Sequence, residues 1–151
     1  MNYSQLKRLL DLLFLVIISP LILVLVIIVS IILKIENFND EVFFTQERVG
    51  KNNKIFNLYK FRSMNSENNS KDNWTKEDDS RISRVGKILR KTRIDEIPQF
   101  YNVFRNEMSL IGPRPEQTHL AEALYVKYGE SFAKRHSVLP GITGYAQINF
   151  G

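Results

Sequence analysis

Residues 12–33 read LLFLVIISPLILVLVIIVSIIL, and this stretch decides the fold of the chain. It carries no charged residue, and its only side chains that are not large and apolar are Ser19, Pro20 and Ser30. As a helix rising about 1.5 Å per residue it would measure roughly 33 Å, enough to cross a hydrocarbon core of about 30 Å. No small-residue cleavage signature follows it, so we expect a permanent membrane segment rather than a cleaved signal peptide.

Ser19 and Pro20 interrupt this apolar segment. Proline removes one backbone hydrogen bond and clashes with the preceding turn, so we expect a bend that leaves two arms, each too short to cross alone. Lys7 and Arg8 precede the segment and a basic region follows it, so the preference of positive charge for the cytoplasm pulls both ends to one side. On these residues alone two interpretations stay open. One is a re-entrant helix, and the other is a kinked spanning helix, in which proline is tolerated.

The rest of the 151-residue chain is long enough for one small globular domain of roughly 110 residues. The net charge is +5, and between Arg48 and Arg93 there are 13 Lys and Arg residues against 5 Asp and Glu residues. Such a region fits a surface facing anionic lipid, a nucleotide or headgroup site, or nucleic acid. No recognisable nucleic-acid module accompanies it, so no nucleic-acid partner is expected. The absence of Cys excludes disulfides, Cys-zinc sites and thiol catalysis.

The part after the membrane segment predicts an α+β domain that is mostly helical. Residues 41–46 and 55–61 alternate like strands around turn residues 49–54 and indicate a β-hairpin. Helical patterns cover residues 81–93, 96–105, 119–128 and 131–137. Residues 107–111 fit a short strand, residues 63–80 a polar surface loop, and residues 140–144 a loop of turn formers. We therefore divide the chain into a membrane segment, residues 1–36, and a second domain, residues 37–151.

Asp95 and Glu96 are adjacent carboxylates in the most basic stretch of the chain, RKTRIDEIPQ at residues 90–99. Pro98 and the apolar pattern after it predict a helix start, a place where phosphate groups gather and a carboxylate stays ionised and nucleophilic. The alternative is structural, with Asp95 capping the helix and Glu96 complementing its dipole. Together with the apolar segment, the pair points to phosphate chemistry at a membrane face.

Several short motifs, spread in order over essentially the whole chain, resemble the bacterial sugar transferase family. These are the monotopic phosphoglycosyl transferases, which start glycan assembly on a polyprenyl phosphate carrier. The matching pieces are KRLLD at residues 7–11 leading to Ser19-Pro20, Gln46-x-Arg48-x-Gly50, LYKFRSM at residues 58–64, the run from Asp95-Glu96 through Gln99, Asn102 and Met108-Ser109 to IGPRP at residues 111–115, and PGITG at residues 140–144. Catalytic domains of the family usually continue for some tens of residues past the last motif, so the resemblance implies that this sequence lacks a C-terminal segment.

The resemblance implies a re-entrant helix bent at Ser19-Pro20 and a catalytic domain on the cytoplasmic face of the bacterial inner membrane. It also implies a reaction in which a nucleotide diphosphate sugar, commonly a UDP-sugar, donates sugar-1-phosphate to polyprenyl phosphate with Mg²⁺. That step would start the assembly of a capsule, exopolysaccharide, O-antigen or glycoprotein glycan. Asp95 and Glu96 would be the catalytic pair and the metal site, with Asp95 as the nucleophile.

Four cations are candidates for binding the substrate phosphates: Arg90, Arg114, Lys60 and Arg62. Each has a plainer interpretation as a solvated, lipid-facing or salt-bridged side chain, and we rank Lys60 and Arg62 below the other two. A rival class is a non-catalytic, truncated membrane-associated scaffold or lipid-binding protein. The sequence names neither the sugar nor the oligomeric state, so a homo-oligomer stays open.

Overall fold

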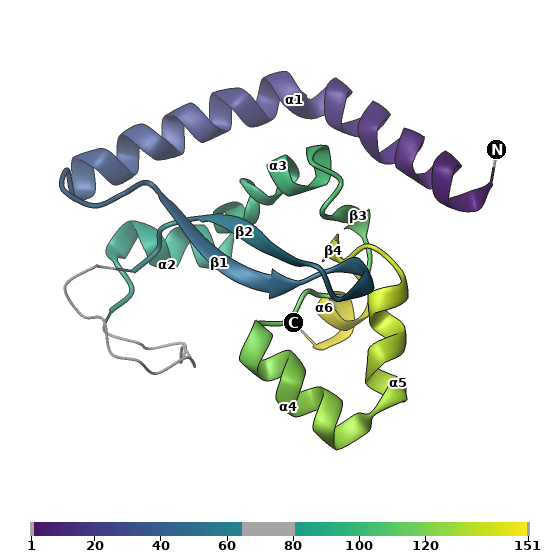
Figure 1. Ribbon diagram of the computed structural model, residues 1–151. Coiled ribbons are helices and arrows are strands. Elements are labelled where there is room, and N and C mark those ends of the chain that lie inside the picture. The colour runs from purple at the N-terminus through teal and green to yellow at the C-terminus, as the bar shows by residue number, and fades with distance from the viewer. Residues whose placement is uncertain (1, 65–80, 151) are drawn as a thin grey trace.

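The computed structural model of the protein describes residues 2–64 and 81–150. Its N-terminal helix, α1 (Tyr3–Glu36), arches over a domain built from two small sheets and several short helices (Figure 1). The Asn2 side chain caps the first turn of α1 by accepting the backbone N–H of Gln5. The helix is long and apolar enough to cross a membrane, which agrees with the prediction from the sequence.

Helix α1 continues through Pro20 instead of breaking there. Because Pro20 has no N–H, the carbonyl of Val16 loses its usual donor, and the Ser19 hydroxyl donates to that carbonyl at 2.9 Å instead. The helix bends near its middle (Figure 1). The Ser19-Pro20 pair therefore gives one bent helix rather than two separate arms.

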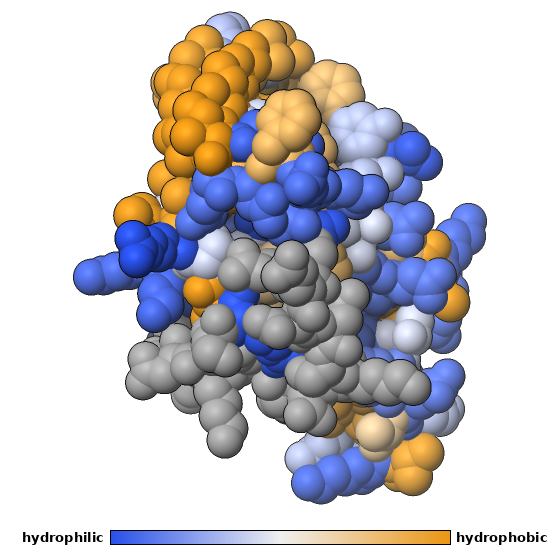
Figure 2. All heavy atoms as spheres, turned by 90° about the vertical axis from the view of Figure 1, so that its left-hand side faces the viewer, coloured by the Kyte–Doolittle hydropathy of each residue, from blue (hydrophilic) through white to orange (hydrophobic). Residues whose placement is uncertain are grey.

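Most of the large apolar side chains of α1 are exposed, and Figure 2 shows them gathered above a hydrophilic body. An exposed apolar surface of this extent is typical of a membrane contact and not of a protein surrounded by water. On the inner side, Leu15, Val29 and Leu33 are buried against the domain. α1 thus has one apolar side that packs against the domain and another apolar side that is suited to lipid.

The N-terminal end of α1 is tied to the domain by polar contacts. Asp11 is buried, and its carboxylate accepts hydrogen bonds from Lys7 Nζ at 3.2 Å and from the Ser109 hydroxyl at 2.6 Å. Lys7 Nζ also contacts the Ser109 hydroxyl. The Arg8 guanidinium donates to the carbonyls of Val103 and Phe104, at 2.6 and 3.1 Å. These contacts give each charged side chain of the KRLLD motif a polar partner, which the buried Asp11 in particular requires.

The C-terminal end of α1 is tied to the same domain. The carboxylate of Glu36 accepts the Ser83 hydroxyl at 2.8 Å and the backbone N–H of Val85 at 3.0 Å. Lys34 Nζ donates to the carbonyls of Phe38 and Asp40, just past the helix end. Both ends of α1 therefore lie against one globular body.

A β-hairpin forms the centre of the domain, as predicted. Strands β1 (Phe43–Val49) and β2 (Ile55–Phe61) pair antiparallel, and the 3₁₀ turn η1 (Lys51–Asn53) lies between them. Leu58 of β2 packs with Leu15, Val103 and Met108 in one hydrophobic cluster. Phe61 packs with Val29, Leu33 and Leu89 in another. The hairpin and α1 thus share both cores.

A second, two-stranded parallel sheet joins β3 (Ser109–Ile111) to β4 (Gly141–Thr143). β3 was predicted within residues 107–111, whereas the prediction of a plain loop at residues 140–144 was wrong. The Ser109 N–H donates to the Pro140 carbonyl at 2.8 Å and the Gly112 N–H to the Thr143 carbonyl at 2.9 Å. A Cβ at position 141 would overlap the Gly112 backbone nitrogen, so glycine permits this close pairing.

The remaining elements are short. They are α2 (Arg84–Lys91), η3 (Ile94–Glu96), α3 (Gln99–Phe104), α4 (Thr118–Tyr128), α5 (Glu130–Ala133), η4 (Lys134–Ser137) and α6 (Tyr145–Phe150). The predicted helices at 81–93, 119–128 and 131–137 are confirmed with trimmed or split ends. The predicted helix at 96–105 begins later, at Gln99, because the acidic pair forms its own 3₁₀ turn. The predicted loop at 63–80 lies, from residue 65 onward, outside the described residues.

Asn102 is fully buried and links α3 to the edge of β2 that does not pair with β1. Its carbonyl oxygen accepts the Tyr59 N–H at 3.1 Å, and its amide nitrogen donates to the Asn57 carbonyl and to Glu107, both at 2.7 Å. Replacing it by the isosteric Leu leaves these groups unpaired. We expect Asn102→Leu to lower the free energy of unfolding by about 2–4 kcal/mol.

Thermal or denaturant unfolding in detergent measures this effect. The matched control is Asn149→Leu, because the Asn149 side chain on α6 is exposed and bonds only to its own helix. The control should change stability by less than about 0.5 kcal/mol. Equal stability of the two variants would contradict the role given to Asn102.

Candidate active site

Asp95 and Glu96 occupy the 3₁₀ turn η3 between α2 and α3. The turn starts at Arg93, whose backbone is left-handed with φ of 59°. A non-glycine residue in that region costs about 1 kcal/mol or more and persists only where the surroundings enforce it. The reversal turns both carboxylates inward, where their residues are only 7% and 8% exposed. The acidic pair is therefore placed by a strained turn and not by a regular helix.

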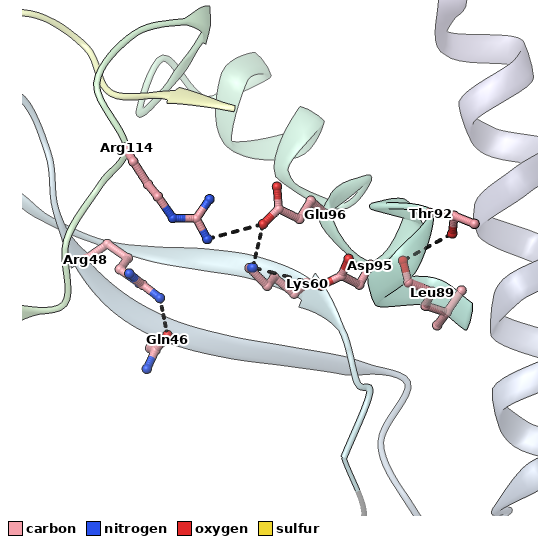
Figure 3. A network of polar contacts seen from close by, with 8 residues as sticks. All are labelled: Gln46, Arg48, Lys60, Leu89, Thr92, Asp95, Glu96 and Arg114. Atoms are coloured by element: carbon pink, nitrogen blue, oxygen red, sulfur yellow. Dashed lines mark hydrogen bonds and ion pairs between the residues drawn. The ribbon is translucent and has the colours of Figure 1, made fainter. Parts of the chain in front are cut away.

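Lys60 of β2 reaches both carboxylates (Figure 3). Its ammonium lies 2.8 Å from Glu96 Oε1 and 4.0 Å from Asp95 Oδ2. Arg114, from the segment after β3, lies 3.4 Å from the same Glu96 oxygen. Glu96 is therefore held by two cations, while Asp95 keeps only a longer contact with one of them.

The cations that lie nearest to the acidic pair in the structure are not the two that we ranked highest from the sequence. Arg114 lies at the pair, as expected, and Lys60, ranked low, is the nearest cation. Arg90 lies on α2, and its positive charge acts on Asp95 without an ion pair of its own among the described contacts. Arg62 forms an ion pair with Glu41 at 3.4 Å. The structure thus brings together two of the four candidate phosphate-binding residues.

The two carboxyl groups have pKa values shifted in opposite directions. Burial raises the pKa of Asp95, with the charge of Lys60 opposing the shift and that of Glu96 adding to it. Burial also acts to raise the pKa of Glu96, but the charge and hydrogen bond of Lys60, with Arg114 and Arg93, outweigh it and lower that pKa. A pair of adjacent acids with diverging pKa values is typical of acids with different tasks. Asp95 is therefore the more basic carboxylate of the two.

Two further arginines support Arg114, and reasoning from the sequence gave neither a role. Arg48 is buried in β1 and donates to the Pro115 carbonyl at 2.9 Å and to Gln46 Oε1 at 2.6 Å (Figure 3). Burial and the nearby charge of Arg114 lower the pKa of Arg48 to about 10. Arg135 donates to the Arg114 carbonyl at 2.7 Å. The place of Arg48 in the Gln46-x-Arg48-x-Gly50 motif was the one sequence feature that could have indicated its role. No sequence feature indicated a role for Arg135.

Asp95 and Glu96 are the described residues that could hold a magnesium ion together with a phosphate-bearing molecule. Among residues 2–64 and 81–150 no group of three or more His, Cys, Asp or Glu side chains could hold a metal alone. Mg²⁺ is commonly held by one or two carboxylates together with phosphate oxygens and water. Asp95 and Glu96 supply that number of carboxylates. The site would therefore bind the ion mainly when phosphate groups complete its shell.

An apolar bent helix docked on a small domain, with a buried acidic pair contacted by two cations, defines a membrane-associated protein with a charged candidate site. Residues 2–151 match the bacterial sugar transferase family. The chain belongs to that family, as the resemblance of its motifs indicated.

The chain is similar to several curated relatives. It is 44% identical over 151 residues to a UDP-N-acetylgalactosamine-undecaprenyl-phosphate N-acetylgalactosaminephosphotransferase of Aeromonas hydrophila. The aligned region covers 99% of this chain and 35% of that relative. It is 42% identical over 148 residues to a UDP-glucose:undecaprenyl-phosphate glucose-1-phosphate transferase of Klebsiella pneumoniae, and the aligned region covers 95% of this chain and 30% of that relative. It is 48% identical over 108 residues to the uncharacterized sugar transferase EpsL of Bacillus subtilis, covering 72% and 51%. The chain thus spans between about a third and a half of the length of these relatives.

Proposed function

We propose that this chain carries the catalytic site of a phosphoglycosyl transferase. It transfers sugar-1-phosphate from a nucleotide diphosphate sugar, a UDP-sugar, to polyprenyl phosphate and so starts the assembly of a glycan. The observation that carries the proposal is the buried Asp95–Glu96 pair, held by Lys60 and Arg114 in a domain docked on an apolar helix. The activities named for the Aeromonas and Klebsiella relatives support the substrate class.

The proposed reaction has two displacements at one phosphorus atom. A carboxylate oxygen of Asp95 attacks the sugar-bearing β-phosphorus, the bond from that phosphorus to the bridging oxygen breaks, and UMP leaves with the electron pair. An oxygen of polyprenyl phosphate then attacks the same phosphorus, the bond to the Asp95 oxygen breaks, and the carboxylate is regenerated. The product is a polyprenyl diphosphosugar. No net proton transfer through Asp95 is needed.

The cations around the pair have a defined task in this scheme. Lys60 and Arg114 neutralise negative charge on the diphosphate, and Arg48 and Arg135 hold the segment that carries Arg114. Mg²⁺, when bound by Asp95 or Glu96, would supply further charge neutralisation at the phosphate oxygens. Glu96, with its lowered pKa, remains ionised and keeps Lys60 in place.

The test is direct. Purified protein incubated with a UDP-sugar, Mg²⁺ and polyprenyl phosphate should release UMP, and intact-protein mass spectrometry without acceptor should show one phosphosugar adduct. The rival function, a non-catalytic scaffold or lipid-binding protein, predicts lipid binding without UMP release or adduct. The same assay on a C-terminally extended version separates an inactive fragment from a scaffold.

We further propose that α1 is re-entrant, with both ends on the side of the membrane that holds the domain, the cytoplasmic face. Contacts of Lys7, Arg8 and Asp11 at one end and of Glu36 at the other support this. A spanning helix would pull one of these charged ends across the bilayer and away from its partners, so these polar contacts would be lost.

Cysteine labelling tests the topology, because the natural chain has no Cys. Single cysteines at Ser4, before the apolar segment, and at Glu122, exposed on α4, should react with an impermeant maleimide from the same side of sealed vesicles. A cysteine at Leu21, exposed on the apolar face, should stay protected in lipid and react in detergent. Labelling of positions 4 and 122 from opposite sides would mean that α1 crosses.

A further inference from the structure

A pocket of about 330 Å³ lies between the middle of α1 and the domain. Helix α1 packs on the domain through Leu15 before its bend and through Val29 and Leu33 after it, and it arches between these contacts (Figure 1). Ile22 and Val26, from the arched part, line the pocket on the side of the helix. Aromatic side chains of the domain form much of the remaining wall: Phe43, Tyr59, Phe100 and Tyr101. We call this space the arch pocket.

The surface that lines the arch pocket is almost wholly apolar. Two of its side chains, Phe43 and Tyr101, are 41% and 53% exposed, so the pocket is open to a ligand and is not a sealed part of the core. Leu21 and Leu23, the neighbours of Ile22 on α1, belong to the exposed apolar surface that is suited to lipid. A sugar or a phosphate would lose its hydration there without gaining hydrogen bonds, whereas a hydrocarbon chain gains from burial. The arch pocket therefore fits a lipid chain.

The arch pocket lies next to the acidic pair. Ile97, the residue after Glu96, lines it together with Phe100. The same two side chains also line a second pocket, of about 320 Å³, whose wall includes Glu96. Lys60 and Arg114 lie 2.8 and 3.4 Å from the Glu96 carboxylate. An apolar space for a chain and two cations for a phosphate thus adjoin one short segment of the protein.

We infer that the arch pocket receives the first isoprene units of the polyprenyl phosphate acceptor and so brings the phosphate of the acceptor to Asp95. This inference rests on the proposed function and deepens it by giving the acceptor a site. A pocket of this size holds only the head end of a long chain, and the rest of the chain stays in the bilayer along the exposed side of α1. The methyl branches of the chain pack on the aromatic rings of the wall.

An acyl chain of an ordinary phospholipid is the competing occupant. Glycerol and ester groups separate such a chain from its phosphate, whereas a polyprenyl chain is bonded directly to its phosphate. With the phosphate at the cations beside Glu96, the ester groups of a phospholipid would lie in the apolar surroundings of Ile97 and Phe100, where burial of unpaired carbonyl groups is costly. The chemistry of the walls therefore favours the polyprenyl chain.

Photolabelling tests the inference without relying on turnover. The full chain is placed in vesicles of phosphatidylethanolamine and phosphatidylglycerol with a trace of polyprenyl phosphate that carries a diazirine on its first isoprene unit. After illumination, mass spectrometry should locate the label on residues of the arch pocket, and excess unlabelled polyprenyl phosphate should suppress it. A phosphatidic acid with a diazirine on its acyl chain is the matched probe, and it should label the exposed side of α1 instead.

Two tryptophan variants of α1 provide the matched comparison. Ile22→Trp fills the arch pocket from the side of the helix, and Leu23→Trp places the same ring at the neighbouring exposed position. We expect the label in the pocket to fall roughly tenfold in Ile22→Trp, because a few apolar groups of the lipid lose their contacts, and to stay unchanged in Leu23→Trp. Thermal unfolding shows whether each variant keeps its fold. If Ile22→Trp fails to fold, the position of the label in the unaltered protein and its suppression by polyprenyl phosphate decide.

The other outcomes separate the inference from the proposed function. Equal labelling of the pocket by the phosphatidic acid probe would assign it to the bulk bilayer and overturn the inference, as would undiminished labelling of a folded Ile22→Trp. Suppressible labelling of the pocket in a protein that never releases UMP would keep the lipid site and remove the proposed function. UMP release by a protein whose arch pocket is never labelled would keep the proposed function and overturn the inference.

Discussion

Asp95→Asn is expected to abolish UMP release, with a loss of roughly 10³-fold or more. The amide has the shape of the carboxyl group but no negative charge, so it cannot form the bond to phosphorus. Because burial already raises the pKa of Asp95, an uncharged side chain fits its environment, and the fold should be retained or slightly stabilised. Loss of activity can then be separated from loss of structure by thermal unfolding of the same sample.

Two measurements make this prediction decisive. The variant should show no phosphosugar adduct by mass spectrometry, and its thermal midpoint should equal or slightly exceed that of the wild type. Glu122→Gln, which removes an exposed carboxylate on α4, is the matched control and should retain full activity. Undiminished UMP release by Asp95→Asn would remove this residue from the nucleophile role.

The elements that could be predicted are those fixed by local pattern. The uncharged run at residues 12–33 predicts a helix in lipid, whether that helix spans the membrane or re-enters. The alternation at residues 55–61 predicts a strand, whichever partner strand it pairs with. The adjacent acids and the Ser19-Pro20 bend are likewise visible in the sequence. Each of these features depends on neighbours within one or two turns of the chain.

The features that could not be predicted depend on distant partners. Gly141 and Thr143 look like loop residues, and only pairing with β3, some thirty positions earlier, makes them a strand. Lys60 was ranked below Arg90 because Arg90 is nearer to Asp95 in sequence, yet β2 carries Lys60 onto the acidic pair. The sequence also does not reveal that the Gln147 amide is buried without a hydrogen-bond partner among residues 2–64 and 81–150.

The KRLLD motif illustrates the same division. Lys7 and Arg8 of this motif predict the topology, and the structure shows a second task for the motif, in which Asp11 accepts a hydrogen bond from Ser109, almost a hundred positions later. That contact ties the membrane helix to β3, and β3 leads directly into the segment that bears Arg114. The position of Arg114 is thus linked to the docking of α1 on the domain.

Lys60→Met is expected to produce the second large loss, about 10²-fold in kcat/KM at neutral pH, because it removes the cation nearest to both carboxylates. It should also change the pH profile. Burial raises the pKa of Asp95 and the charge of Lys60 opposes that rise, so without Lys60 this pKa climbs further. Activity requires the ionised carboxylate, and the acid limb of kcat/KM should therefore move to higher pH.

The controls for this prediction use charge and position. Lys60→Arg keeps a cation and should hold the acid limb near its wild-type position, even if geometry lowers the rate. Lys54→Met removes an exposed lysine just before β2 and should change neither rate nor profile. In Lys60→Met both acids should become easier to protonate, because Lys60 is also the cation that contributes most to lowering the pKa of Glu96. An acid limb that stays in place, or moves to lower pH, in Lys60→Met would show that Lys60 does not set the ionisation of the nucleophile.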